Sequence, residues 1–170
     1  MNGRTHMAGG VALACGLNIT GAFADSPVKL AALIGSSLIG AVILDIDKKN
    51  TTISNRHPVV SFFTRLFTTH RGFTHSLLSM VITGSLVYII SSAIVPNLKN
   101  PVCSGYLLGY LSHLILDMLN PKGVPLFFPC KVKISLAGIK TGGITEAVIR
   151  LALVVVIIAE GYLIYKGGLL

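Results

Sequence analysis

Charged residues are scarce in this chain of 170 residues. They make up 12% of the sequence, whereas soluble globular domains carry roughly 25%. So few charges cannot cover a water-soluble surface, and a hydrophobic content of 52% excludes intrinsic disorder. We therefore expect the chain to fold in a lipid bilayer, and its length predicts one domain over residues 1–170.

Cysteine and tryptophan are also rare, with three cysteines and no tryptophan. Cys15, Cys103 and Cys130 are too few for a disulfide scaffold, and none lies in a close-spaced zinc motif, so we expect buried free thiols. The net charge of +8 would suggest nucleic acid as a partner of a soluble protein. The aromatic residues are not interleaved with basic ones, however, so no nucleic-acid partner is expected. In a membrane protein the same excess of cations marks cytoplasmic loops.

The hydrophobic residues fall into five stretches, each to be compared with the roughly 20 residues that cross a hydrocarbon core. We expect each stretch to be a helix, because lipid offers no hydrogen-bond partners to the backbone of an open strand. The predicted helices cover residues 7–24, 29–44, 76–95, 102–119 and 147–165. The first two are short for a membrane span. The predicted fold class is an all-α, polytopic transmembrane bundle of about five helices.

Two polar segments connect these helices. Residues 48–74 form a basic, threonine-rich loop, and residues 121–145 contain three prolines. A Lys-Val-Lys-Ile alternation at 131–134 predicts a short strand or an interfacial β-hairpin within the second loop. If the helices alternate in direction, 11 of the 14 Lys and Arg residues lie on the side of the N-terminus. The positive-inside bias then places the N-terminus in the cytoplasm and the C-terminus outside.

The same threading brings most of the histidines and aspartates to the cytoplasmic side, where they form a candidate metal site. The predicted ligands are His6, Asp45, Asp47, His70, His75, His113 and Asp117. We expect His6 just before the first helix and His75 just inside the third. His113 and Asp117 are four residues apart on one helix face, where they can bind one ion or form a structural hydrogen bond. Each residue taken alone could be a solvated or capping group, but seven ligands on one face predict a metal site.

These ligands suit zinc, with manganese or iron as alternatives. Seven ligands exceed what one ion takes, so we expect two or three ions. Hydrolysis by metal-activated water is the corresponding chemistry, with Asp47 or Asp117 accepting the proton. Arg71 and the start of the third helix, with Thr74 as its N-cap, would bind a phosphate group.

Several sequence blocks carry a family resemblance: HRGFTHSLL at 70–78, GYLSH at 109–113, DML at 117–119 and PKGVPL at 121–126. In these blocks the chain resembles the YdjM family of bacterial inner-membrane proteins. That family is described as metal-dependent hydrolases, first through an SOS-regulated member that LexA controls.

The resemblance spans about residues 6–129. It implies the seven ligands above, with Arg71 and Thr74 between them. The family's distant similarity to zinc phospholipase C and the P1-type nucleases implies a phosphoester substrate. One departure is Leu44, where the family usually has proline before its Asp-x-Asp pair.

The sequence therefore predicts a membrane-bound hydrolase of a phospholipid-like or other amphiphilic phosphate, with membrane lipid as a partner and a cytoplasm-facing His/Asp site. Two alternatives stay open. An ion- or proton-coupled transporter would use the same residues as an ion site, although inverted repeats and broken midplane helices are not evident. A structural or regulatory membrane protein would bind the metal only for stability.

Overall fold

The computed structural model describes residues 1–47, 72–130 and 132–168. These residues form five α-helices and no strand, which confirms the predicted all-α class. The helices are α1 (Gly3–Leu17), α2 (Pro27–Ile43), α5 (Leu77–Ile94), α6 (Lys99–Met118) and α7 (Ile144–Lys166). Three short 3₁₀ helices accompany them: η1 (Leu44–Asp47), η2 (Phe73–His75) and η3 (Pro96–Leu98).

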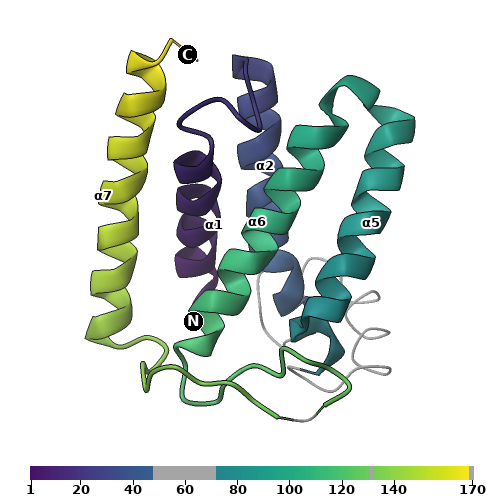
Figure 1. Ribbon diagram of the computed structural model, residues 1–170. Coiled ribbons are helices and arrows are strands. Elements are labelled where there is room, and N and C mark those ends of the chain that lie inside the picture. The colour runs from purple at the N-terminus through teal and green to yellow at the C-terminus, as the bar shows by residue number, and fades with distance from the viewer. Residues whose placement is uncertain (48–71, 131, 169–170) are drawn as a thin grey trace.

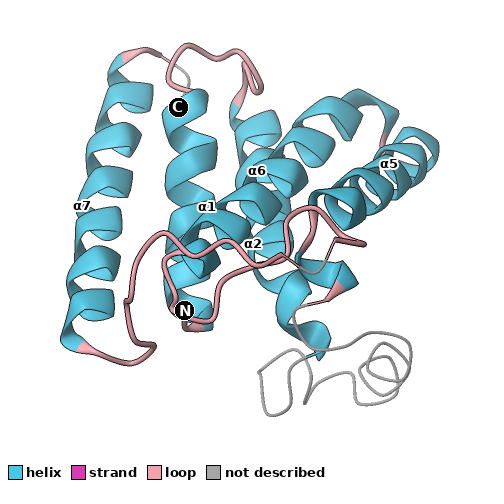
Figure 2. Ribbon diagram, turned by 60° about the horizontal axis from the view of Figure 1, so that its bottom comes forward, coloured by secondary structure: helices cyan, strands magenta, loops and turns pink. Residues whose placement is uncertain are grey.

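Successive helices run in opposite directions (Figure 1). Helices α1, α2 and α6 lie in the middle, with α7 packed on α1 at one edge and α5 packed on α6 at the other. The N-terminus, the end of α2, the start of α5 and the α6–α7 loop share one end of the bundle, called here the N-terminal end. The C-terminus lies at the opposite end. Figure 2 turns the N-terminal end toward the viewer and shows the α6–α7 loop running across it.

Helix α1 starts and ends earlier than the predicted range of 7–24 because two asparagines cap it. The side chain of Asn2 accepts the backbone N–H of Arg4 at the start. At the other end Asn18 accepts the N–H groups of Phe23 and Ala24, which holds the following loop in a non-helical conformation. His6 consequently lies inside α1, not before it as expected.

The start of α5 also differs from the prediction. Ser76, not Thr74, is the N-cap, and its hydroxyl accepts the N–H of Ser79. Thr74 and His75 lie in η2, so His75 precedes α5 instead of lying inside it. The expected strand or hairpin in the α6–α7 loop is reduced to one antiparallel bridge between Val124 and Ile134 among the described residues.

The cysteines are free, as predicted, but only Cys15 is buried. Cys103 is half-buried and Cys130 is exposed. The expectation of a buried thiol is therefore wrong for Cys130, which lies in the α6–α7 loop, outside the packed helices.

Helices α2 and α6 pack most extensively, and glycines allow their backbones to approach closely. A Cβ atom at Gly105 or Gly109 of α6 would overlap the carbonyl oxygen of Leu33 or Ser37, respectively. Gly-x-x-x-Gly spacing of this kind is typical of helices that pack closely in membranes. The contact brings the last turn of α2 against the last turns of α6.

Two helices, α5 and α7, are long and apolar enough to cross a membrane by length and composition. Helix α2 is apolar but shorter, with 17 residues. The two candidate spans lie at the edges of the bundle and expose large apolar side chains such as Ile94 and Ile144. That arrangement suits helices that face lipid.

Candidate metal centre

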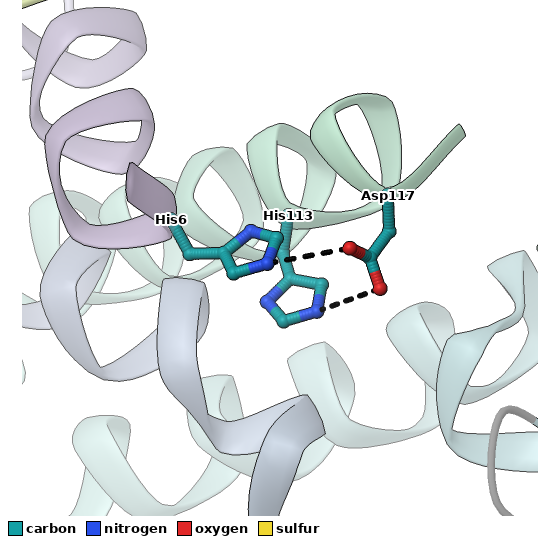
Figure 3. Close-up of side chains that lie close together, drawn as sticks. All are labelled: His6, His113 and Asp117. Carbon is teal, nitrogen blue, oxygen red and sulfur yellow. Dashed lines mark ion pairs between the residues drawn. The ribbon is translucent and has the colours of Figure 1, made fainter. Parts of the chain in front are cut away.

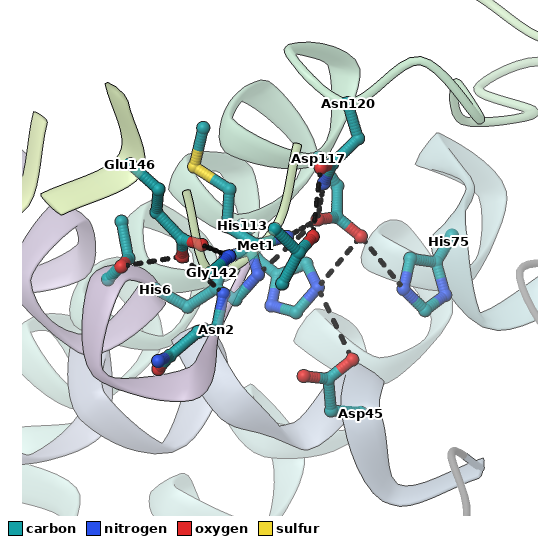
Figure 4. Close-up of polar contacts among 12 residues, drawn as sticks. Met1, Asn2, His6, Asp45, His75, His113, Asp117, Asn120, Gly142 and Glu146 are labelled. Carbon is teal, nitrogen blue, oxygen red and sulfur yellow. Dashed lines mark hydrogen bonds and ion pairs between the residues drawn. The ribbon is translucent and has the colours of Figure 1, made fainter. Parts of the chain in front are cut away.

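Five of the predicted ligands meet at the N-terminal end of the bundle. The residues of this His/Asp cluster are His6 of α1, Asp45 of η1, His75 of η2, and His113 and Asp117 of α6. Figure 4 shows their side chains pointing toward one another. The three histidines are fully buried, and Asp45 and Asp117 are 7% and 1% exposed. Segments far apart in the sequence therefore supply one enclosed group of nitrogen and oxygen atoms.

His6, His113 and Asp117 form the tightest part of the cluster (Figure 3). Nε2 of His6 lies 3.4 Å from Oδ1 of Asp117, and Nε2 of His113 lies 3.7 Å from Oδ2 of the same carboxylate. The two imidazole rings stack with centroids 3.7 Å apart and an interplanar angle of 9°. Two charged imidazoliums would repel each other in this arrangement. The stacking therefore suits neutral rings, the form that binds a metal.

The orientation of His113 follows from one backbone contact. Its Nδ1 lies 2.6 Å from the carbonyl oxygen of Ala41 in α2. A carbonyl can only accept, so Nδ1 carries a proton, and in a neutral ring Nε2 then presents a lone pair. That lone pair faces Asp117 and also Asp45, whose Oδ1 is 4.0 Å away. A lone pair facing two carboxylates is unfavourable unless a cation lies between them.

Two sets of three side chains could each hold an ion: His6, His113 and Asp117, and Asp45, His75 and His113. In each set, one ligand atom per residue lies within 4.8 Å of the others. Both ring nitrogens of His6 and Nε2 of His113 are buried without a hydrogen bond in the described part of the chain. Buried polar atoms are normally hydrogen-bonded, so these nitrogens fit a metal ion. Because Nδ1 of His113 is engaged with Ala41, its single remaining nitrogen can bind one ion at a time, and the two sets share this ligand.

Two further donors hold Asp117, and the sequence reasoning missed both. Nδ2 of Asn120 donates to Oδ1 of Asp117 at 2.8 Å, and the amino group of Met1 donates to the same oxygen at 2.5 Å. The amide oxygen of Asn120 accepts the hydroxyl of Thr141 at 3.1 Å, which links the cluster to the α6–α7 loop. Asn120 lies three residues after Asp117 at a helix end, and this spacing is the signal in the sequence that could have identified it.

Thr74 and Tyr110 position His75. The hydroxyl of Tyr110 in α6 donates to the carbonyl oxygen of Thr74, which holds η2 against α6. The hydroxyl of Thr74 lies 3.1 Å from Nδ1 of His75. The expected role of Thr74 in phosphate binding stays a prediction.

Three predicted site residues are not placed by the structure. His70 and Arg71 lie outside the described residues, and for Asp47 only the backbone in η1 is described. The fourth aspartate, Asp25, lies away from the cluster, at the opposite end of the bundle. It pairs with Lys29 at 2.7 Å, and a hydrogen bond from this lysine lowers the pKa of Asp25.

Comparisons with known proteins point to one family of membrane proteins. The profile of the YdjM inner membrane protein family matches residues 1–168. A Bacillus subtilis (strain 168) protein named "Uncharacterized protein YvsG" is 33% identical over 168 residues, which cover 98% of each chain. The inner membrane protein YdjM of Escherichia coli (strain K12) is 34% identical over 102 residues, 58% of this chain and 50% of that protein. No solved structure matches the chain.

Proposed function

Because this chain belongs to the YdjM inner membrane protein family, we propose that it is a membrane-bound, metal-dependent hydrolase of phosphoesters that acts at the His/Asp cluster. One observation carries the proposal. Both imidazole nitrogens of His6 and Nε2 of His113 are buried beside the carboxylate of Asp117 and make no hydrogen bond within the described residues. A divalent cation is the group that would satisfy these nitrogens and the carboxylate together.

His6, His113 and Asp117 would hold an ion, with Asp45 and His75 as further ligands. Zinc suits this donor set best, with manganese or iron as alternatives. With Asp47 and His70 added, the ligands exceed those of one ion, so we expect two or three. Bound divalent ions acidify water and polarise a phosphoryl oxygen, which is the chemistry that hydrolysis requires.

The chain itself orders the ligands and handles the proton. The carbonyl of Ala41 orients His113, and Asn120 orients Asp117. Burial of the cluster excludes bulk water, which strengthens electrostatic interactions there. A carboxylate oxygen of Asp117 or Asp47 would accept the proton from water, and Arg71 and Thr74 would bind the phosphate.

The proposed substrate is a phospholipid-like or other amphiphilic phosphate. The cluster lies at one end of the helices, which in a membrane would bring it close to the lipid headgroups. The charges support five membrane passages with the N-terminal end in the cytoplasm. The described cations of that end are Arg4, Lys122, Lys133, Lys140 and Arg150, and those of the opposite end are Lys29, Lys99 and Lys166.

The test compares His113→Ala and Asp117→Asn with the matched control Asp25→Asn, which changes an exposed aspartate at the opposite end. Each protein is purified in detergent without chelator, and its metal is measured by elemental analysis. Hydrolysis is followed with bis(p-nitrophenyl) phosphate. Wild type and Asp25→Asn should hold stoichiometric metal and hydrolyse the ester. The two cluster variants should lose metal, and activity should fall by about 10²-fold or more. Wild-type protein without stoichiometric metal would refute the proposal.

The burial of the cluster favours a second candidate function, a metal-stabilised structural or regulatory membrane protein. Structural metal sites are closed, whereas catalytic sites keep a position open for water or substrate. Here the five described ligands are all buried. Under this alternative, a chelator lowers the melting temperature of the wild-type protein while no phosphoester is turned over.

A further inference from the structure

A second polar pocket lies at the N-terminal end, beside the His/Asp cluster. It has a volume of about 290 Å³ and is lined by residues at the starts of α1 and α7. Met1 and Asn2 lie between this pocket and the His/Asp cluster. The amino group of Met1 donates to Asp117, whereas the backbone N–H of Asn2 donates to Glu146 in the wall of the pocket. The pocket is therefore distinct from the proposed metal centre.

Two guanidinium groups line this pocket, from Arg4 in the first turn of α1 and Arg150 in the second turn of α7. Neither forms an ion pair with a carboxylate of the described residues. Arg4 is exposed and Arg150 is half-buried. The pocket thus combines two forked hydrogen-bond donors whose charges are available to a ligand.

The one carboxylate in the pocket wall is already engaged. Oε1 of Glu146 accepts the N–H of Asn2 at 2.6 Å and the hydroxyl of Thr5 at 2.8 Å. Oε2 accepts the N–H of Gly142, also at 2.6 Å. Glu146 is 1% exposed and its oxygens accept these neutral donors, so it joins α1 to α7 and forms no ion pair with either arginine.

The start of α7 adds to the positive character of the pocket. Its N-cap is Gly143, and no side chain caps the first turn. The uncapped amides of a helix start complement a negative group. Arginine pairs with phosphate oxygens through two parallel hydrogen bonds, and two arginines line the pocket beside this turn.

We propose that this pocket binds a phosphate group, with the headgroup of an anionic phospholipid as its source. Basic pockets between helices on the cytoplasmic side of a membrane protein are typical sites for such headgroups. The proposal concerns lipid binding only and does not rest on hydrolysis at the cluster.

The test uses the full chain in detergent micelles of a neutral surfactant. Short-chain phosphatidic acid and phosphatidylcholine are titrated separately, and bound lipid is counted by native mass spectrometry. Phosphatidic acid should bind and phosphatidylcholine should not. Arg4→Gln or Arg150→Gln should weaken binding about fivefold, and the double variant about thirtyfold, because each basic residue near an anionic group contributes additively.

Two lysine variants serve as matched controls. Lys140→Gln removes a cation from the same end but outside the pocket lining, and Lys166→Gln removes one from the opposite end. Both should bind phosphatidic acid like the wild type. Circular dichroism and melting without lipid verify that each variant is folded. Arg150→Lys should restore part of the affinity, because the charge is kept and the fork is lost.

A parallel titration with inorganic phosphate separates the two sources of the ligand. If phosphate alone binds as tightly as phosphatidic acid, and the double variant abolishes both, the site is a phosphate site and the lipid source is wrong. Equal binding of phosphatidic acid by wild type and a folded double variant would overturn the whole proposal. An equal loss of phosphatidic acid affinity in Lys140→Gln would also overturn it. The lipid would then be attracted by the overall positive charge of the N-terminal end and not by this pocket.

Discussion

His113 is the residue on which the candidate centre depends most. Its Nδ1 donates a hydrogen bond to the carbonyl of Ala41, and its Nε2 faces the carboxylates of Asp45 and Asp117. The ring also stacks on His6. The position of its Nε2 atom therefore depends on how α2 packs on α6. Small changes in that helix contact should therefore change metal binding.

Asn120 allows a prediction at the residue scale. Asn120→Ala removes the amide that donates to Asp117 and accepts from Thr141. Metal affinity should fall by about 10–100-fold, the usual effect of losing a group that orients a ligand. Competition with a chromophoric chelator measures it. The matched control is Asn97→Ala, an exposed asparagine in η3 at the opposite end, which should leave the affinity unchanged. Equal affinities of wild type and Asn120→Ala would contradict this role.

At the scale of elements, the contact between α2 and α6 decides whether the cluster forms. Asp45 follows α2 and His113 belongs to α6, so their distance depends on how closely these helices approach. Gly105 and Gly109 permit that approach, because a larger side chain would meet the backbone of α2. The binding chemistry therefore depends on residues that cannot themselves bind a metal.

Gly109→Ala tests this dependence. The added methyl group would overlap the carbonyl of Ser37, so stability should fall by about 1–3 kcal/mol, the cost of overpacking a tight contact. Thermal unfolding in detergent measures the loss, and metal content should fall with it as His113 shifts away from Ala41.

Gly35→Ala in α2 provides the control for that substitution. A Cβ atom there meets nothing within 4 Å, so stability should be unchanged or rise slightly through better helix propensity. If the two variants melt at the same temperature as the wild type, the close helix contact is not required.

At the scale of the whole molecule, the alternation of the helices separates two ends with different character. The N-terminal end holds the cluster and most of the described cations, whereas the opposite end holds η3 and the C-terminus. Figure 1 shows the α6–α7 loop at the N-terminal end and the α5–α6 connection at the other. In a membrane, these two connections would lie on opposite sides.

Cysteine labelling in intact cells checks this topology. Cys130 is exposed in the α6–α7 loop and should react with a membrane-impermeant maleimide only after the cells are permeabilised. Asn97→Cys, made together with Cys130→Ser, should react from outside without permeabilisation. Labelling of both positions from the same side would refute the proposed orientation.

Much of the fold was predictable because helix formation in lipid depends on apolar stretches that are visible in the sequence. All five expected helices exist. Their ends were less predictable, because capping depends on local hydrogen bonds of Asn2, Asn18 and Ser76. The same limit applies to the site. Alternation alone brings His6, His113 and Asp117 to one end, but it does not show which ring nitrogen faces which carboxylate.

By itself, the sequence determined the helical class, the membrane character and the end of the bundle at which imidazoles and carboxylates gather. These properties follow from composition and from the order of apolar and polar segments along the chain. Only the tertiary structure decided that two ligand sets share His113, that Asn120 supports Asp117 and that Glu146 joins α7 to α1. Glu146 and Thr5, for example, are 141 positions apart in the chain. Such contacts depend on how the helices pack side by side, and packing is set by shape and hydrogen-bond geometry that a linear pattern does not contain.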